Sequence, residues 1–537
     1  MMVSPLLLRH FLTRSRQFFA GKEIVSRDYG GLFRYDYGRF YERTARLANV
    51  LAGLGVGPGD RVGTLAWNNH RHLELYFAVP CSGAVLHTLN IRLFRDQLVY
   101  VINHAADRVI FVDEDLLPVL EDVAGELKTV EHFVVMTDRK ECPATRLAPV
   151  HLYEDLLAGA APDYAFPEDM EENSAAAMCY TTATTGDPKG VVYSHRGLYL
   201  HSLAFLMADT IGLSERDCML PVVPMFHANA WGLPFSAALA GSRQVFPGSR
   251  PTPADLAGLI ETEKVTVAAG VPTVWMGLLE LLEREEHDLS SLRVVVCGGS
   301  AAPRALLEAY DRRGITIVHA YGMTETSPLA TVSRPVSRMD DWPADRRYQV
   351  RAKQGWLVPG LEMRVVDDQG REAPRDGRAM GELWLKGPWV ADGYYRDPER
   401  SRETFADGWL HTSDIVTVDT DGFIAIVDRS KDLIKSGGEW ISSVDLENCI
   451  MSHPAVAEAA VIAVPHPKWV ERPLACVVLK AAYRDQVDEA ALLEFLAGKV
   501  IRWWLPDRVV FLDEIPKTSV GKFSKKRLRE LLERGEI

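Results

Sequence analysis

Tyr180-Thr-Thr-Ala-Thr-Thr-Gly-Asp-Pro-Lys-Gly190 is the stretch from which this sequence is best interpreted, and Pro516-Lys-Thr-Ser-Val-Gly-Lys-Phe523 is its counterpart near the C-terminus. The first packs four hydroxyls, a lysine and two glycines into a run with no core-forming side chain after Tyr180. Such a run can offer backbone N–H groups, hydroxyl donors and a cation to a polyphosphate. It is not a Walker A loop, because Gly186 and Gly190 have neither its spacing nor its Lys-Ser/Thr ending.

Composition narrows the class of protein. A chain of 537 residues is too long for one hydrophobic core, so several domains are expected. The net charge of −13 argues against a nucleic-acid-binding protein, which would need a basic face. The seven cysteines are scattered and never form a C-x-x-C pair. This favours reduced thiols in a cytoplasmic protein over disulfides or a zinc site.

No integral membrane segment is expected, because no apolar run approaches the roughly 20 residues that span a bilayer. The opening 22 residues contain four basic residues and no acid, which is also typical of a transit peptide. We favour a first domain helix, since one apolar face could be formed by Leu6, Leu7, Leu8, Phe11, Phe18 and Phe19.

Helical and strand patterns alternate from Arg34 to about Ala240, as in the expected helix 40–54 and strand 61–66. The middle of the chain repeats the alternation, with a helix over 253–263 and a strand over 292–297. Near-continuous Val-rich strands between helices predict parallel sheets that are covered by helices on both faces.

After Gly355 the pattern changes to short strands separated by Gly and Asp turns, which predicts a small β-rich subdomain. Past Asp428 about 110 residues remain, a size that suits one small α+β domain. We therefore expect an α/β protein with a large N-terminal domain (1–427), a linker (428–433) and a small C-terminal domain (434–537).

Tyr321-Gly-Met-Thr-Glu-Thr326 follows an expected strand, which places Glu325 at the carboxyl edge of a parallel sheet. Ligands of such sheets bind at this edge. The plainer alternative is a solvated surface acid. A carboxylate beside a polyphosphate is, however, what Mg²⁺ requires, since the ion prefers one or two carboxylates and phosphate oxygens.

Three further segments carry polar groups. The first is His411-Thr-Ser-Asp414, in which Asp414 could accept both hydroxyls of a ribose, although an ordinary turn aspartate would look the same. The second, Asp428-Arg-Ser-Lys-Asp-Leu433, alternates charges as solvated linkers do. The third, Lys435-Ser-Gly-Gly-Glu-Trp440, contains glycines that let a ligand approach the backbone closely.

In order and spacing, these segments resemble the motif set of the superfamily of acyl-CoA synthetases, peptide-synthetase adenylation domains and luciferases. Finer strings are similar to bacterial medium- and long-chain fatty-acyl-CoA synthetases: Trp67-Asn-Asn69, His72-Leu-Glu-Leu-Tyr-Phe77, Leu220-Pro-Val-Val-Pro-Met-Phe-His227, Asn229-Ala-Trp231 and Ile434-Lys-Ser-Gly-Gly-Glu-Trp-Ile-Ser442. The resemblance implies a two-step reaction. A carboxylate and ATP give an acyl-adenylate and pyrophosphate, and CoA then takes the acyl group, with Mg²⁺ as cofactor. It also suggests a homodimer through the N-terminal domain.

The resemblance also implies roles for particular residues. The ATP phosphates would be wrapped by Thr181, Thr182, Thr184, Thr185, Gly186 and Lys189. Mg²⁺ would lie near Thr181 and Glu325. The adenine and acyl-adenylate cleft would be formed by Ala228, Gly299, Ser300, Ala301, His319, Ala320, Tyr321 and Thr324.

For the C-terminal part, the resemblance implies that Asp414 and Arg429 hold the ribose and that Lys431 is the hinge of a mobile domain. Lys522 would serve adenylation. The thioester half-reaction would use Lys435, Gly437, Gly438, Glu439 and Trp440. His227 and Trp231 sit where the family places aromatic gates to the acyl pocket, and both could also be plain core aromatics.

Two positions depart from the family pattern, which has glycine where this chain has Ala183 and Ser413. If position 183 needs a positive φ, alanine there costs about 1 kcal/mol. A catalytically weakened homologue is therefore one alternative. Others are a CoA ligase for aryl or dicarboxylic acids, a carrier-dependent adenylation domain and a luciferase-like enzyme. Because no carrier domain follows Lys522, we expect free CoA as the acceptor.

Overall fold

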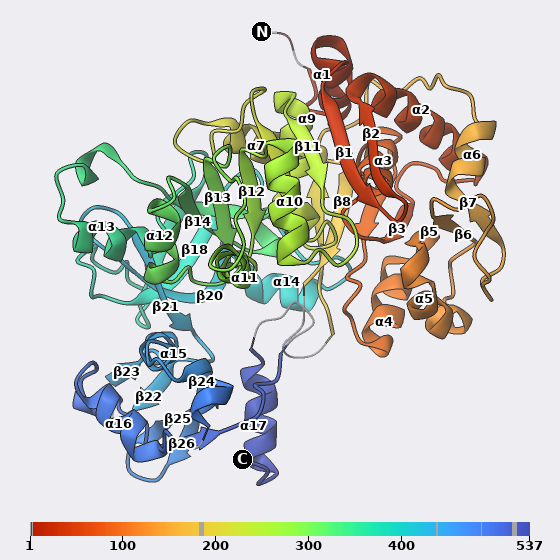
Figure 1. Cartoon of the computed structure of the whole chain (residues 1–537). Coiled ribbons are helices and arrows are strands. Elements are labelled where there is room, and N and C mark those ends of the chain that lie inside the picture. The colour runs from red at the N-terminus through yellow and green to blue at the C-terminus, as the bar shows by residue number, and fades with distance from the viewer. Residues whose placement is uncertain (1, 3, 182–186, 437–438, 485, 518–522) are drawn as a thin grey trace. The chain divides into compact units, whose positions relative to one another are not determined.

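The computed structural model describes residues 2, 4–181, 187–436, 439–484, 486–517 and 523–537 (Figure 1). By its internal contacts the chain divides into two units. The described residues of the first unit fall within Met1–Thr181, Asp187–Glu362 and Lys386–Leu410, and those of the second within Met363–Leu385 and His411–Ile537.

A nine-stranded sheet forms the centre of the first unit. Its six central strands run parallel, and antiparallel strands lie at both edges. In spatial order the strands are β16 (Trp356–Leu357), β15 (Leu329–Ser333), β14 (Thr316–Gly322), β13 (Val294–Gly298), β12 (Val267–Gly270), β10 (Cys218–Pro221), β11 (Arg243–Phe246), β1 (Glu23–Asp28) and β2 (Gly31–Asp36).

A seven-stranded sheet is the second layer of this unit, and all its strands except β9 run parallel. In spatial order its strands are β7 (Val150–Leu152), β6 (His132–Met136), β5 (Asp107–Asp113), β3 (Arg61–Leu65), β4 (Val85–Thr88), β8 (Ala175–Tyr180) and β9 (Gly190–Ser194). The chain leaves β3 for β4 on one side and later returns to β5 on the other. The predicted parallel sheets are thus confirmed.

Helices alternate with these strands and cover the sheets (Figure 1). The start of α10 shows the local cause, because Thr252 caps Asp255 N and Pro253 occupies the first turn. The helices of the unit are α1 (Arg9–Phe19), α2 (Tyr37–Gly53), α3 (His70–Cys81), α4 (Arg95–Ala105), α5 (Leu117–Val123), α6 (Tyr153–Gly159), α7 (His195–Leu206), α8 (Ala228–Trp231), α9 (Leu233–Ala240), α10 (Pro253–Glu263), α11 (Pro272–Leu282), α12 (Arg304–Asp311), α13 (Ala344–Arg351) and α14 (Pro398–Thr404).

The first helix belongs to this unit, since Arg14 Nε of α1 donates to Leu239 O of α9 at 3.0 Å. The predicted apolar face was partly wrong. Leu7 and Leu8 are buried but precede the helix, and Phe18 is 61% exposed. Two residues ahead of the helix therefore anchor it, which helical periodicity does not reveal.

The second unit contains a small β-sheet region and an α+β region. The β-sheet region uses β17 (Glu362–Val366), β18 (Gly381–Lys386), β20 (Trp409–Val418) and β21 (Ile424–Arg429). In the first unit, the short strand β19 (Phe405–Ala406) pairs with Trp409 and Leu410.

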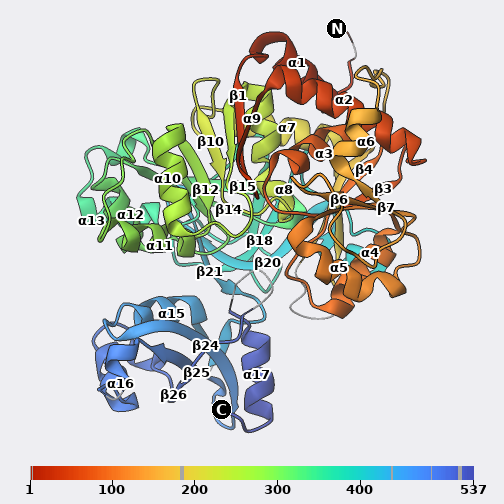
Figure 2. The same ribbon diagram turned by 45° about the vertical axis from the view of Figure 1, so that its right-hand side comes forward.

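In the α+β region, helices cover both faces of a sheet (Figure 2). Val461 and its neighbours on one face pack against α15 and α16, while Ile462 on the other face packs against Leu528 of α17. The elements are β22 (Ile434–Ser436), β23 (Glu439–Ile441), α15 (Ser443–Met451), β24 (Val456–His466), β25 (Val470–Leu479), α16 (Glu489–Ala497), β26 (Arg508–Phe511) and α17 (Lys525–Glu533). The predicted small α+β region is confirmed.

Among the helices of the described residues, none is both long and apolar enough to cross a lipid bilayer.

Candidate nucleotide site

Glu325 lies just past the carboxyl end of β14, in the 3₁₀ turn Thr324–Thr326, as the sequence predicts. Its side chain is buried, so the alternative of a solvated surface acid is wrong. Glu325 Oε1 accepts a hydrogen bond from Tyr394 Oη at 2.7 Å. A buried carboxylate with an ordered hydroxyl donor is a fixed negative group at the ligand-binding edge of the sheet.

Tyr394 also contacts Lys189, so one phenol lies between an ammonium and a carboxylate. Lys189 Nζ donates to Tyr394 Oη at 3.3 Å and lies 4.4 Å from the ring centroid. Burial lowers the pKa of Lys189, an effect that the charge of Glu325 opposes. Burial and the same charge raise the pKa of Tyr394, which keeps the phenol neutral and able to donate. Tyr394 is not among the site residues predicted from the sequence, because nothing in Gly393-Tyr-Tyr395 marks it.

The phosphate-binding stretch begins and ends on the antiparallel pair β8–β9. Thr181 N donates to Lys189 O at 2.9 Å, and Lys189 N donates to Thr181 Oγ1 at 3.3 Å. A Cβ on Gly190 would lie 3.0 Å from the Tyr180 ring, which explains the glycine there. The other predicted members of the stretch lie outside the described residues: Thr182, Ala183, Thr184, Thr185 and Gly186.

Trp231 lies against the glycines at the end of β13. A Cβ on Gly298 would lie 3.2 Å from the Trp231 indole and 2.7 Å from Ala320 O, so only glycine leaves room for this packing. Residues 228–231 have φ values of 43°, 53°, 49° and 56°. Such left-handed conformations cost a non-glycine residue about 1–2 kcal/mol each. Strain of this kind concentrates at functional sites. Trp231 is nevertheless buried, and His227 half-buried, as core aromatics would be.

The other predicted cleft residues lie at the carboxyl ends of β13 and β14. Gly299, Ser300 and Ala301 are exposed directly after β13, and Gly299 has a φ of 82°. His319 and Ala320 are buried within β14, which also contains the half-buried Tyr321. His319 Nδ1 donates to Lys353 O at 3.0 Å, and burial lowers its pKa. The structure thus brings these predicted residues to one sheet edge.

In the second unit, Asp414 and Arg429 are directly opposite each other on β20 and β21. Arg429 Nε lies 2.8 Å from Asp414 Oδ1. Asp414 is buried inside a strand, so the alternative of an ordinary turn aspartate is wrong. Its neighbour Ser413 has a φ of 59°, which identifies the physical reason for the family's glycine at this position.

The charged segment 428–433 is only partly solvated. Lys431 is exposed, whereas Asp428 and Asp432 are buried. Asp428 Oδ2 accepts from Ser443 N at 2.7 Å, and Arg529 Nη2 donates to Asp432 Oδ1 at 2.6 Å. Both ends of the segment are therefore tied to helices of the α+β region.

Lys435 and Trp440 pair across β22 and β23, with Lys435 Nζ 4.9 Å from the indole centroid. Lys435 N donates to Glu471 Oε2 at 2.8 Å. Three further predicted site residues, all in the C-terminal part, also lie outside the described residues: Gly437, Gly438 and Lys522. The side chain of Glu439 is not described either.

Among the described residues, no cluster of three or more His, Cys, Asp or Glu could hold a metal ion by protein ligands alone. Glu325 and Thr181 instead provide one carboxylate and one hydroxyl. This all-oxygen pair fits Mg²⁺, which typically keeps waters and phosphate oxygens as its remaining ligands.

Comparison with known proteins identifies the family of this chain. The profile of the AMP-binding enzyme family matches residues 13–395, and that of the AMP-binding enzyme C-terminal domain matches residues 445–522. A long-chain-fatty-acid–CoA ligase of Thermus thermophilus is 50% identical over 99% of this chain and 96% of its own. A 3-methylmercaptopropionyl-CoA ligase of Ruegeria pomeroyi is 44% identical over 99% and 98%. A medium-chain-fatty-acid–CoA ligase of Ectopseudomonas oleovorans is 42% identical over 99% and 96%.

Solved structures of other proteins are similar to this chain over almost its whole length. An anthranilate CoA ligase in complex with anthranoyl-AMP superposes with a TM-score of 0.87 at 27% identity, covering 100% of this chain and 99% of that one. ATP-bound MatB of Rhodopseudomonas palustris has a TM-score of 0.83 at 27% identity and covers 98% of each chain.

Proposed function

Because the chain belongs to the AMP-binding enzyme family, we propose that it is an AMP-forming CoA ligase for medium- to long-chain fatty acids. In the first step, a carboxylate oxygen attacks the α-phosphorus of ATP, and the α–β bridging P–O bond breaks to release pyrophosphate. In the second, the CoA thiolate attacks the acyl carbon, a C–S bond forms and AMP leaves. The observation that carries the proposal is the Lys189–Tyr394–Glu325 array at the carboxyl edge of the nine-stranded sheet.

The first unit would bind the triphosphate. Lys189 would neutralise phosphate charge, and Thr181 would hold the near end of the phosphate stretch. Glu325 and Thr181 would hold Mg²⁺, which supplies further charge neutralisation when bound. Such preorganised electrostatic stabilisation is commonly the largest catalytic contribution, and no protein nucleophile is required. Tyr394 would be a positioning residue that orients both charged groups.

Asp414 would bind the ribose hydroxyls, and Arg429 would fix the direction of its carboxylate. We place the domain boundaries at 427 and 434, with Lys431 as the hinge of the C-terminal domain. Lys522 would act in adenylation and Lys435 in thioester formation. These assignments rest on the family motifs and on the ion pair between Asp414 and Arg429.

The acyl chain length of the preferred substrate is the sharpest test of the proposal. One relative is named for a short thioether acid and two for longer fatty acids. Each buried CH₂ contributes about 0.8 kcal/mol, or roughly fourfold in kcat/KM. Pyrophosphate release with ATP and CoA should therefore rise from acetate to dodecanoate until the pocket ends. Trp231→Ala should change this profile more than the KM for ATP.

Three results would contradict the proposal. A flat profile from acetate to dodecanoate would remove the fatty-acid assignment. Absence of pyrophosphate release with every fatty acid would favour a catalytically weakened homologue. A preference for 3-methylmercaptopropionate over octanoate would move the specificity to short thioether acids.

A further inference from the structure

A cavity of about 230 Å³ lies in the first unit, and none of its lining residues belongs to the nucleotide site described above. It lies where strands from both sheets end. The residues that line it are Arg27, Asp28 and Tyr29 at the end of β1, Trp67 and Asn69 after β3, Asp113 at the end of β5, and Gly248 and Ser249 after β11. This volume is many times the ~15 Å³ that one water needs.

The order of strands in the seven-stranded sheet makes the position of the cavity typical of a ligand-binding site. The strand β3 has β4 on one side and β5 on the other, so the strand order reverses between β3 and β5. In open α/β sheets, ligands bind outside the carboxyl ends of the strands at such a switch point. The nine-stranded sheet has its own reversal at β10, between β11 and β12. The cavity lies at the switch point of the seven-stranded sheet, and the proposed reaction makes no use of it.

Carboxylates with only neutral donors lie at the cavity. Asp113 is 1% exposed and accepts from Trp67 N at 2.7 Å and from Asn69 Nδ2 at 3.0 Å. Asp115 does not line the cavity itself, but it accepts from three lining residues: from Tyr29 Oη at 2.7 Å, Ser249 Oγ at 2.8 Å and Trp67 Nε1 at 3.1 Å. Within the described part of the chain, no Lys, Arg or His forms an ion pair with Asp113 or Asp115.

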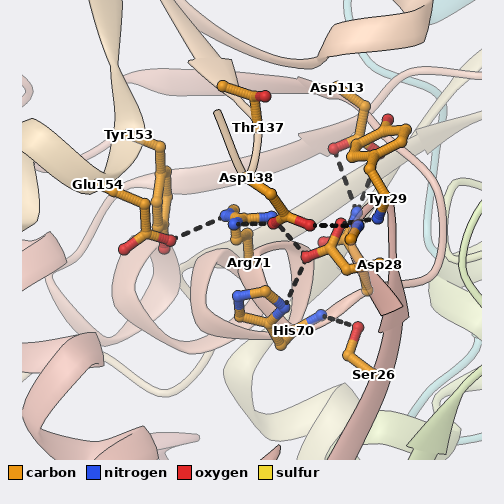
Figure 3. Close-up of polar contacts among 12 residues, drawn as sticks. Ser26, Asp28, Tyr29, His70, Arg71, Asp113, Thr137, Asp138, Tyr153 and Glu154 are labelled. Atoms are coloured by element: carbon orange, nitrogen blue, oxygen red, sulfur yellow. Dashed lines mark hydrogen bonds and ion pairs between the residues drawn. The ribbon is translucent and has the colours of Figure 1, made fainter. Parts of the chain in front are cut away.

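The arginines near the cavity already form ion pairs with carboxylates. Arg71 contacts three carboxylates at 2.7–2.9 Å: Asp28, Asp138 and Glu154 (Figure 3). The lining residue Arg27 pairs with Asp255 at 3.3 Å. His70 lies 3.4 Å from Asp28, but burial holds its pKa well below the ordinary value, so it is neutral.

The pKa values of two carboxyl groups at the cavity reflect this shortage of positive charge. Burial, with the charges of Asp28 and Asp115, raises the pKa of Asp113 to about 8. Burial similarly raises the pKa of Asp28 to about 6. A cation in the cavity would relieve both groups.

We propose that this cavity binds a small organic cation, an ammonium or guanidinium, with its charged group at Asp113 and its body against Tyr29 and Trp67. Aromatic rings attract such cations through the negative faces of their π-systems. A metal ion fits less well, because the described residues hold no metal-binding cluster of three or more His, Cys, Asp or Glu. The site is distinct from that for ATP and does not depend on the proposed reaction.

Direct binding tests the site. Butylammonium and methylguanidinium are titrated into the full-length protein by calorimetry at pH 8.5, above the pKa of about 8 for Asp113, and at constant ionic strength. We expect saturable binding of at least one of them and none of butanol, which has a similar apolar body without the charge. Asp113→Asn should weaken binding at least tenfold. The matched control Asp169→Asn, at an exposed carboxylate, should leave it unchanged.

Tyr29→Ala provides a second test, which removes the ring and its hydrogen bond to Asp115 but keeps Asp113 and the donors Trp67 N and Asn69 Nδ2, and it should also weaken binding. Absence of saturable binding to the wild type, or equal binding by Asp113→Asn, would overturn the proposal. So would loss of binding when AMP is present, because the cation would then occupy the nucleotide site. Saturable Mg²⁺ or K⁺ binding that Asp113→Asn abolishes, without binding of either organic cation, would make this a metal site instead.

Discussion

At the scale of single residues, Tyr394 is the least expected member of the nucleotide site. Its hydroxyl donates to Glu325 and accepts from Lys189, so one neutral group sets the positions of two opposite charges. Glu325 is buried and cannot turn to water for a replacement donor. Removing the hydroxyl should therefore disturb the charges that act on the phosphates.

Tyr394→Phe should lower the rate of pyrophosphate release by about 10-fold to 10²-fold, somewhat less than loss of a direct oxyanion donor. Conversion of synthetic acyl-adenylate and CoA to product should be nearly unchanged, because no triphosphate takes part in that step. Tyr395→Phe, at the neighbouring tyrosine, is the matched control and should retain both activities. Equal loss in the two half-reactions would contradict the positioning role.

Ser413 carries backbone strain at a position where the family pattern has glycine. Its φ of 59° is left-handed, a conformation that glycine adopts without steric cost. Ser413→Gly should raise the free energy of unfolding by about 0.5–1 kcal/mol, once the larger entropy of glycine in the unfolded chain is included.

Chemical denaturation measures this change. The matched control is Ser430→Gly, at an exposed serine without a positive φ, and it should lower stability by a similar amount. If both glycine variants are equally destabilised, strain at Ser413 is not the reason for the family's preference.

At the scale of elements, the loop after β3 joins the two sheets through Asn68. Its Nδ2 donates to Pro221 O and Val223 O at 2.8 Å, and its Oδ1 accepts from Met225 N at 2.7 Å. Asn68 is buried, so no water can replace these partners readily. One amide thus fixes the chain segment that leads from β10 toward His227.

Asn68→Ala should cost about 2–4 kcal/mol, because it leaves several buried backbone groups without partners. Where the variant folds, the KM for dodecanoate should rise more than the KM for ATP, since the segment leads toward the proposed acyl gates. Thermal unfolding and steady-state kinetics test the two parts. Asn49→Ala, at a half-buried asparagine that also donates to backbone carbonyls, is the control and should leave both KM values unchanged.

At the scale of the whole molecule, the proposed reaction divides between two lysines far apart in the sequence. Lys522→Ala should slow adenylation by about 10²- to 10³-fold, as loss of one preorganised donor does. The same variant should still convert acyl-adenylate and CoA to product. Lys435→Ala should show the opposite preference. If both variants lose both half-reactions equally, the division of labour is wrong.

The sequence by itself determined the alternating α/β plan, the bounds of elements such as Pro253–Glu263, and the motifs that indicate the family. These signals are local, because helix and strand periods, caps and phosphate-binding stretches are each written within about a dozen residues. Only the tertiary structure decided that Tyr394 would meet Lys189, 205 residues earlier in the chain. It alone also assembled a cavity from the ends of β1, β3, β5 and β11. The physical reason is that such contacts depend on the order of strands in a sheet, which local periodicity does not encode.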